Sequence, residues 1–294
     1  MNENTAYINK MTLGQKLDAY KRRPGSFIMF LLTWLAAIIT AAVVVIIVAY
    51  ILIKGIPNLK PSLFALEYNS ENVSMLPAII NTVTMTLLSL ALAVPIGVFS
   101  AIYLAEYAKR GNPLVKVVRV TTETLAGIPS IVYGLFGYLI FVIACHFGLS
   151  MLSGALTLAI MILPTMMRTT EEALLSVPDS FREGSFGLGA GRLRTVFRVV
   201  LPSAVPGILS GIILSIGRIV GETAALIYTS GTVAGIPQDL MHSGRTLSIH
   251  MYALLSEGLY MEEAYATAVV LLVMVLVINM LSGVIAKRLS AKKG

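Results

Sequence analysis

The sequence has little charge. Only 13% of its 294 residues are Asp, Glu, Lys or Arg, whereas 56% are hydrophobic and the mean hydropathy is +0.83. A typical soluble domain carries about 25% charged residues, so this chain has too few to cover a surface that faces water. The composition excludes an ordinary soluble protein and predicts that lipid surrounds much of the chain.

Cysteine and catalytic motifs are also scarce. The single cysteine, Cys145, excludes an internal disulfide and any zinc or iron–sulfur site built from several cysteines. The phosphate loop G-x-x-x-x-G-K-[ST] and the HExxH and GxSxG motifs are missing. We therefore expect no catalytic residues, no bound cofactor and no metal site, which argues against a membrane-embedded enzyme. Any energy for transport must come from a partner or from an ion gradient.

Six stretches are long and apolar enough to cross a membrane. About 20 helical residues at 1.5 Å each span a hydrocarbon core of ~30 Å, whereas an isolated strand would leave backbone groups unpaired in lipid. The predicted fold class is therefore an all-α polytopic membrane protein. A segment 1–26 precedes a six-helix transmembrane domain 27–286, and a basic tail 287–294 follows it. The predicted spans are 27–53, 76–104, 124–149, 150–167, 204–230 and 264–286.

The basic residues alternate with these spans. Seventeen Lys and Arg residues lie before the first span, between spans two and three, between four and five, and after six. Only Lys54, Lys60 and Arg245 lie in the other connecting segments, which are 54–75 and 231–263. The positive-inside rule therefore places both termini in the cytoplasm. The net charge is +7, but the basic residues cluster between the spans and not on a soluble face, so the charge does not indicate nucleic-acid binding.

The cytoplasmic segment 178–202 carries a recognisable motif. It reads Arg182-Glu183-Gly184-Ser185-Phe186-Gly187-Leu188-Gly189 and ends in Val199-Val200-Leu201-Pro202. An Asp after a proline favours a helix start at Asp179, and small residues let another surface approach closely. The segment resembles the E-A-A-x3-G-x9-I-x-L-P signature of bacterial ABC importer permeases. The matching positions are Glu183, Gly184, Ser185, Gly189, Leu201 and Pro202.

That resemblance implies a type I, MetI-like permease fold in which a short helix couples to an ATPase. The alternative reading of the segment is an interfacial connector held at the membrane by its arginines. A secondary transporter driven by an ion gradient would instead show inverted repeats with broken helices.

Two charges lie inside the fifth span, where insertion of each costs at least ~2.5–3.5 kcal/mol. At ~100° per residue, Arg218 and Glu222 share an arc of about 140° with four glycines. Spaced i, i+4, the two side chains can pair on one helix face. They either tie helices together or form the path of a charged solute. Arg168, near the cytoplasmic end of the fourth span, either belongs to that path or pairs with Glu171 or Glu172.

The context of these charges narrows the family. The stretch Arg218-Ile219-Val220-Gly221-Glu222-Thr223-Ala224-Ala225-Leu226 resembles R-x-x-G-E-T-A-P-L of the PstA family of phosphate importer permeases, with Ala225 in place of proline. The approach to the coupling segment, Met167–Leu174, is similar to the same family. The resemblance implies phosphate as cargo and a path that contains Arg218, Glu222 and Arg168. Hydrogen phosphate carries a proton that Glu222 can accept, whereas sulfate does not.

The resemblance also implies partners. These are two copies of a PstB-like ATPase that uses ATP and Mg, a PstC-like second permease subunit as heterodimer, and an external PstS-like phosphate-binding protein. The expected location is the plasma membrane of a bacterium or archaeon. Leu247–Leu259 has helical spacing of apolar residues. It is expected to lie on the membrane or on another protein. With 54–75 it is a candidate docking surface. Molybdate, sulfate or phosphonate remain alternative cargoes.

Overall fold

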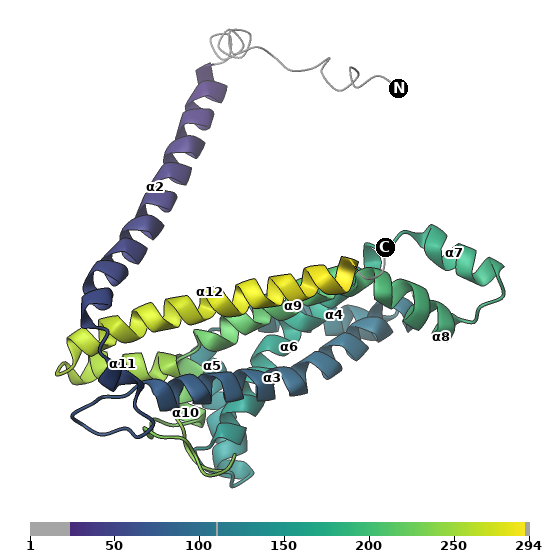
Figure 1. Ribbon diagram of the computed structural model, residues 1–294. Coiled ribbons are helices and arrows are strands. Elements are labelled where there is room, and N and C mark those ends of the chain that lie inside the picture. Colours follow the sequence, from purple (N-terminus) through teal and green to yellow (C-terminus); the bar gives the residue numbers. More distant parts are fainter. Residues whose placement is uncertain (1–23, 110, 292–294) are drawn as a thin grey trace. The chain divides into compact units, whose positions relative to one another are not determined.

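The computed structural model describes residues 24–109 and 111–291, and in this part of the chain every regular element is helical. Three parts of the chain lie outside the described residues. They are residues 1–23 of the predicted N-terminal segment, Arg110, and the last three residues of the basic tail. Within residues 54–291, Figure 1 shows long helices running side by side, joined by short helices and loops. The described residues form helices and no strand, so the predicted all-α class is confirmed.

Five described helices are long and apolar enough to cross a membrane, and a bent pair makes a possible sixth. Three of the predicted spans each fall within one helix or within two consecutive helices. The span 27–53 lies in α2 (Pro24–Gly55), 76–104 in α3 (Leu76–Ile102) and the π-helical η4 (Tyr103–Tyr107), and 264–286 in α12 (Met261–Ala291). The span 150–167 is part of a longer helix, α6 (Met151–Leu175).

The predicted third span, 124–149, is not one straight helix. The chain forms α4 (Pro113–Ala126), then α5 (Ser130–Gly137) and the π-helical η5 (Tyr138–Ala144), with a bend of 105° between the two parts. The bend falls at Gly127-Ile128-Pro129. Proline lacks a backbone N–H and pushes the residue before it out of the helical region, so the helix ends at this point.

The predicted fifth span, 204–230, is also broken. The chain enters it through α8 (Arg192–Thr195) and the π-helical η6 (Val196–Val200), continues as α9 (Leu201–Val220), and restarts as α10 (Ala224–Thr229). Two short helices flank the long ones, α7 (Asp179–Gly187) before α8 and α11 (Leu247–Glu257) before α12. Two 3-10 turns, η2 (Ile56–Asn58) and η3 (Pro61–Phe64), follow α2.

The core of residues 54–291 lies where α6 packs between α3 and α9. Its centre is apolar and includes Met85, Leu158, Met161, Ile162 and Ile219. Glycines allow the close approach: a Cβ at Gly207 would lie 2.5 Å from the Cβ of Ala173, and one at Gly211 would collide with Thr169. Small residues at these positions let the backbones of α6 and α9 approach each other closely. The N-terminal unit, described by itself, is the uniformly apolar and exposed helix α2.

Candidate functional site

Arg218 lies in the last turn of α9 and lines a hollow between three helices. Thr165 of α6 and Asn279 of α12 line the same hollow, together with Ile213, Leu214 and Gly217 of α9. Its volume is about 490 Å³. Arg218 is half-buried, and it joins no ion pair within the described residues. A cation without a carboxylate partner at this depth is available to an anion.

Glu222 forms no ion pair with Arg218 among the described residues, so the i, i+4 pair that the spacing allows is absent. The helix α9 ends at Val220, and Glu222 lies in the break before α10. Its side chain is buried, and Oε1 accepts a hydrogen bond of 3.1 Å from the backbone N–H of Ala225 in the first turn of α10. Its backbone oxygen accepts a hydrogen bond from Ser248 Oγ at 2.6 Å. The carboxylate therefore stabilises the restart of the helix, where helix N-termini favour negative charge.

Arg168 lies one turn beyond Thr165 on α6 and is largely exposed. Its Nε lies 2.9 Å from Oε1 of Glu172, so the pairing foreseen as an alternative is present. Arg168 also lines a second hollow, of about 190 Å³, with Glu123 of α4 and the pair Arg119–Glu171, whose charged atoms are 2.5 Å apart. The structure thus places Arg168 and Arg218 in different hollows. Both border α6, and Thr165 and Arg168 lie about 60° apart around that helix.

The motif segment forms an exposed helix, α7, at one end of the long helices (Figure 1). Pro178 precedes it, and Asp179 supplies an acid in its first turn. Glu183 and Gly184 are exposed, and a Cβ added at Gly184 would meet nothing within 4 Å. Gly189 has φ +82, a left-handed conformation that ends the helix and that glycine adopts without strain. The small-residue face of α7 is therefore open to another surface.

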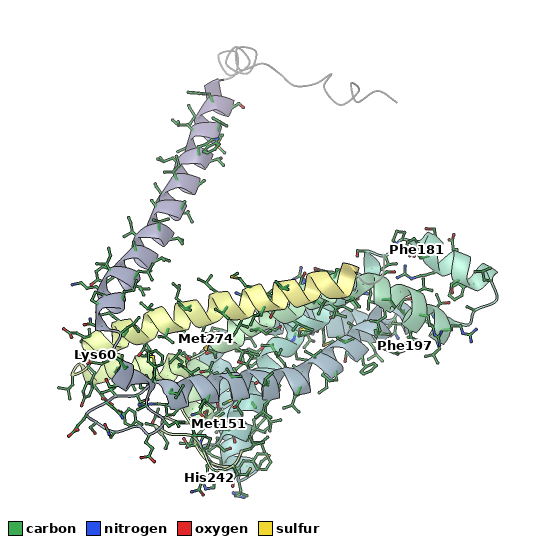
Figure 2. All side chains as sticks on the ribbon, in the orientation of Figure 1. Lys60, Met151, Phe181, Phe197, His242 and Met274 are labelled. Atoms are coloured by element: carbon green, nitrogen blue, oxygen red, sulfur yellow. The ribbon has the colours of Figure 1, made fainter. Side chains whose placement is uncertain are left out.

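Apolar side chains surround this open face. They are Phe181 and Phe186 on α7, Leu188 after it, which is 91% exposed, and Leu193 on α8. Figure 2 labels Phe181, which lies on α7 outside the bundle of long helices. Ser185, a motif residue, bonds to Thr195 Oγ1 through its hydroxyl at 2.8 Å and thereby joins α7 to α8. Leu201 and Pro202 begin α9, next to Val196 and Val200, which are buried in a cluster with Leu174 and Ile102.

Two charged residues that the sequence did not single out hold α7 to the membrane helices. Arg182 of α7 lies 2.6 Å from Oε1 of Glu106 in η4, with side chains only 14% and 8% exposed. The guanidinium also donates to the backbone oxygens of Leu174 at 2.9 Å and Val177 at 2.7 Å. The hydrogen bond to Glu106 raises the pKa of Arg182 above its usual value. An acid in a loop with four basic residues was the available signal for Glu106.

Part of the region after α10 is packed into the protein. In α11, Leu247, Ile249 and Leu254 are buried against other helices of the chain, α3 and α12 among them. That the segment also lies on the membrane or on another protein stays a prediction for its exposed side. Arg245 is buried as well, with its guanidinium 4.5 Å above the ring of Tyr68 from the segment 54–75. The spacing of apolar residues predicts which face of a helix is apolar but not what covers that face. Here other helices of the same chain cover the buried residues. Leu255 and Leu259 remain exposed.

Solved structures with this arrangement of helices are ABC importers. A chain of a bacterial ABC transporter involved in the import of the acidic polysaccharide alginate matches with a TM-score of 0.64 and 18% identity, over 93% of this chain and 99% of that one. A chain of the MetNI methionine ABC transporter in an inward-facing conformation matches with a TM-score of 0.58 and 20% identity, over 72% and 93%. The fold is therefore that of an ABC importer permease.

The family follows from sequence. Residues 93–293 match the model of the binding-protein-dependent transport system inner membrane component, and the chain belongs to this family. It is 33% identical to the probable ABC transporter permease protein YqgI of Bacillus subtilis, over 87% of this chain and 95% of that protein. It is 38% identical to the phosphate transport system permease protein PstA of Pasteurella multocida, over 77% and 81%. The chain is thus a multi-pass, non-catalytic membrane subunit of an ABC transporter.

Proposed function

We propose that this chain is the permease subunit that carries inorganic phosphate inward in an ATP-driven importer. The observation that carries the proposal is the open helix α7, which is joined by the buried pair Arg182–Glu106 to a helical body whose interior holds the unpaired Arg218. An anion permease needs a surface that binds its partner and a cation on the path of the anion. The exposed helix α7 provides the first and Arg218 provides the second. Arginine suits phosphate because its planar guanidinium donates several hydrogen bonds.

The choice of phosphate rests on relatives and on chemistry. PstA proteins from several bacteria, including Yersinia pestis at 34% identity over 79% of this chain, are named as phosphate transport permeases. The unpaired Arg218 supplies charge for an anion, and Arg168 borders the same helix closer to α7. Glu222 is proposed to act indirectly, by fixing the break at which α9 ends beside Arg218.

The assembly is proposed by the same reasoning. A second, PstC-like permease subunit forms a heterodimer with this chain, and two copies of a PstB-like ATPase bind the two coupling helices from the cytoplasm. Glu183, Gly184, Ser185 and Gly189 form the contact surface on this chain, and Leu201 with Pro202 joins it to α9. ATP and Mg bind to the ATPase and not to this chain. A PstS-like binding protein delivers phosphate at the external face of the bacterial or archaeal plasma membrane, with both termini of this chain in the cytoplasm.

The test is purification from native membranes, identification of co-eluting subunits, and reconstitution into vesicles. We expect an ATPase and a second permease subunit to co-elute, and labelled phosphate uptake to require ATP and the binding protein. Excess molybdate, sulfate or phosphonate should not compete. Uptake that continues without ATP and stops when an ion gradient is dissipated would contradict the ATP-driven mechanism. Competition by one of the other oxyanions would change the cargo.

A further inference from the structure

We propose that the hollow between α6, α9 and α12 is a chamber on the anion path, in which Asn279 accepts a hydrogen bond from the protonated oxygen of phosphate while Arg218 holds its negative oxygens. This inference rests on the proposed function and deepens it. It assigns a second polar residue to the site and a reason why phosphate and sulfate differ there.

The position of Asn279 is the first argument. From Ala268 to Ile278 every residue of α12 is apolar, and Asn279 then interrupts this run. The helix α12 packs against α9 (Figure 1). Asn279 and Arg218 line the same hollow from these two helices. Polar side chains within membrane helices are rare and commonly mark substrate pathways or helix contacts.

The state of the amide is the second argument. Asn279 Oδ1 is buried and accepts no hydrogen bond from any residue that the structure describes. Buried polar atoms in native proteins are nearly always hydrogen-bonded, so an unpaired one calls for a ligand or another explanation. Asn279 lines a hollow with a volume of about 490 Å³, many times the ~10–15 Å³ that one water needs when volume is measured in the same way. The hollow is therefore large enough for an anion with part of its hydration shell.

The chemistry of the two residues is complementary. Near neutral pH phosphate carries both negative oxygens and at least one P–OH group. Arg218 donates to the former, and Asn279 Oδ1 accepts from the latter, because an amide oxygen is an acceptor without charge. A neutral acceptor does not repel the anion, as a carboxylate would. Sulfate at the same pH has no proton to donate, so in its presence Oδ1 would stay unpaired or face an oxygen lone pair.

Cysteine labelling tests the chamber without reference to transport. In a Cys145→Ser background, Asn279→Cys is compared with its neighbour Met280→Cys, because Met280 is 70% exposed on the outer side of α12. In lipid vesicles we expect a water-soluble thiosulfonate reagent to modify position 279 and not position 280. An anionic reagent should react at least about threefold faster than a cationic one, and Arg218→Gln should remove this preference. Saturating inorganic phosphate should slow the reaction. An inert position 279, or equal rates for both reagents, would overturn the proposal.

Uptake measurements separate this inference from the proposed function. If the wild-type assembly imports no phosphate, the proposed function fails whatever the labelling result. If it does, Asn279→Leu should reduce phosphate uptake at least tenfold, and Asn279→Gln should retain part of it, with both variants co-purifying with the ATPase. Wild-type uptake by the leucine variant would refute the role of Asn279 in the path. If the leucine variant fails to assemble, the labelling rates decide.

Discussion

Breaking the pair Glu106–Arg182 should uncouple ATP hydrolysis from transport. This pair joins α7, which we propose as the ATPase contact, to the end of α3, and the carboxylate and guanidinium are 8% and 14% exposed. Removing one partner of a buried pair generally costs about 3–5 kcal/mol because the other charge is left without compensation. We expect the low end, about 3 kcal/mol, for Glu106→Gln, because Arg182 keeps its bonds to the carbonyl oxygens of Leu174 and Val177.

An energy of this size changes the population of the attached helix strongly. At about 1.4 kcal/mol for each factor of ten, 3 kcal/mol corresponds to roughly a hundredfold shift toward states in which α7 is detached. The assay is the ratio of ATP hydrolysed to phosphate imported by reconstituted vesicles. Hydrolysis should remain within about threefold of wild type, while uptake should fall at least tenfold. A purely structural effect would instead lower both together.

Asp179 provides the matched control. It pairs with the same arginine at 3.2 Å, but its side chain is 76% exposed. Exposed pairs contribute about 0–1 kcal/mol, so Asp179→Asn should leave the coupling ratio unchanged. Arg182→Gln and Glu106→Gln should be non-additive when combined, because they remove one shared interaction. A normal coupling ratio in Glu106→Gln, or equal damage in Asp179→Asn, would refute the role of the buried pair.

Three other predictions concern different parts of the chain. Gly184→Leu should leave folding intact, since a Cβ there meets nothing within 4 Å, but should abolish co-purification of the ATPase; retention of the ATPase would exclude this face as the contact. Gly211→Val should lower thermal stability by about 1–3 kcal/mol through collision with Thr169. Gly217→Val is its control and should lower thermal stability less, because a Cβ there meets nothing within 4 Å. Burial and the charge of Arg245 lower the pKa of His250 to about 3, from 6.5 when unfolded. The unfolded chain thus binds a proton first as pH falls below about 6.5, and the free energy of unfolding decreases with pH down to about 3. His250→Phe should reduce this loss between pH 7 and 4.5, measured as the shift in melting temperature, and an identical shift in both proteins would refute it.

The sequence predicted the fold class and the exposed motif helix because both depend on local properties. Long apolar runs define membrane helices, and Pro178, Asp179 and Gly189 mark where α7 begins and ends. Breaks were harder to foresee. The pairing of Arg218 with Glu222 that the spacing allows assumed a continuous helix, whereas α9 ends at Val220 and the Glu222 carboxylate bonds to the next helix. A helical wheel has no means of detecting such an interruption.

Contacts between distant segments were the other missing information. The apolar residues of α11 were visible in the sequence, but their burial against α3 and α12 depends on how the chain folds back. Arg182 bonds to Glu106, 76 residues away, and Arg218 shares its hollow with Asn279 of the last helix. No periodicity within either segment indicates such a neighbour. Single polar residues such as Glu106 and Asn279, placed among residues of a different kind, were the only signals.

Two helices connect the proposed chamber to the proposed ATPase contact. The helix α6 supplies Thr165 to the chamber and, about 14 Å further along at 1.5 Å per residue, the Leu174 oxygen that binds Arg182. The helix α9 begins at Leu201, within the motif segment, and carries Arg218 in its last turn. Because Gly207 and Gly211 let these helices pack closely, we expect a displacement of α7 to reach the two walls of the chamber that α6 and α9 form. Coupling through a two-state arrangement of packed helices needs no other connection.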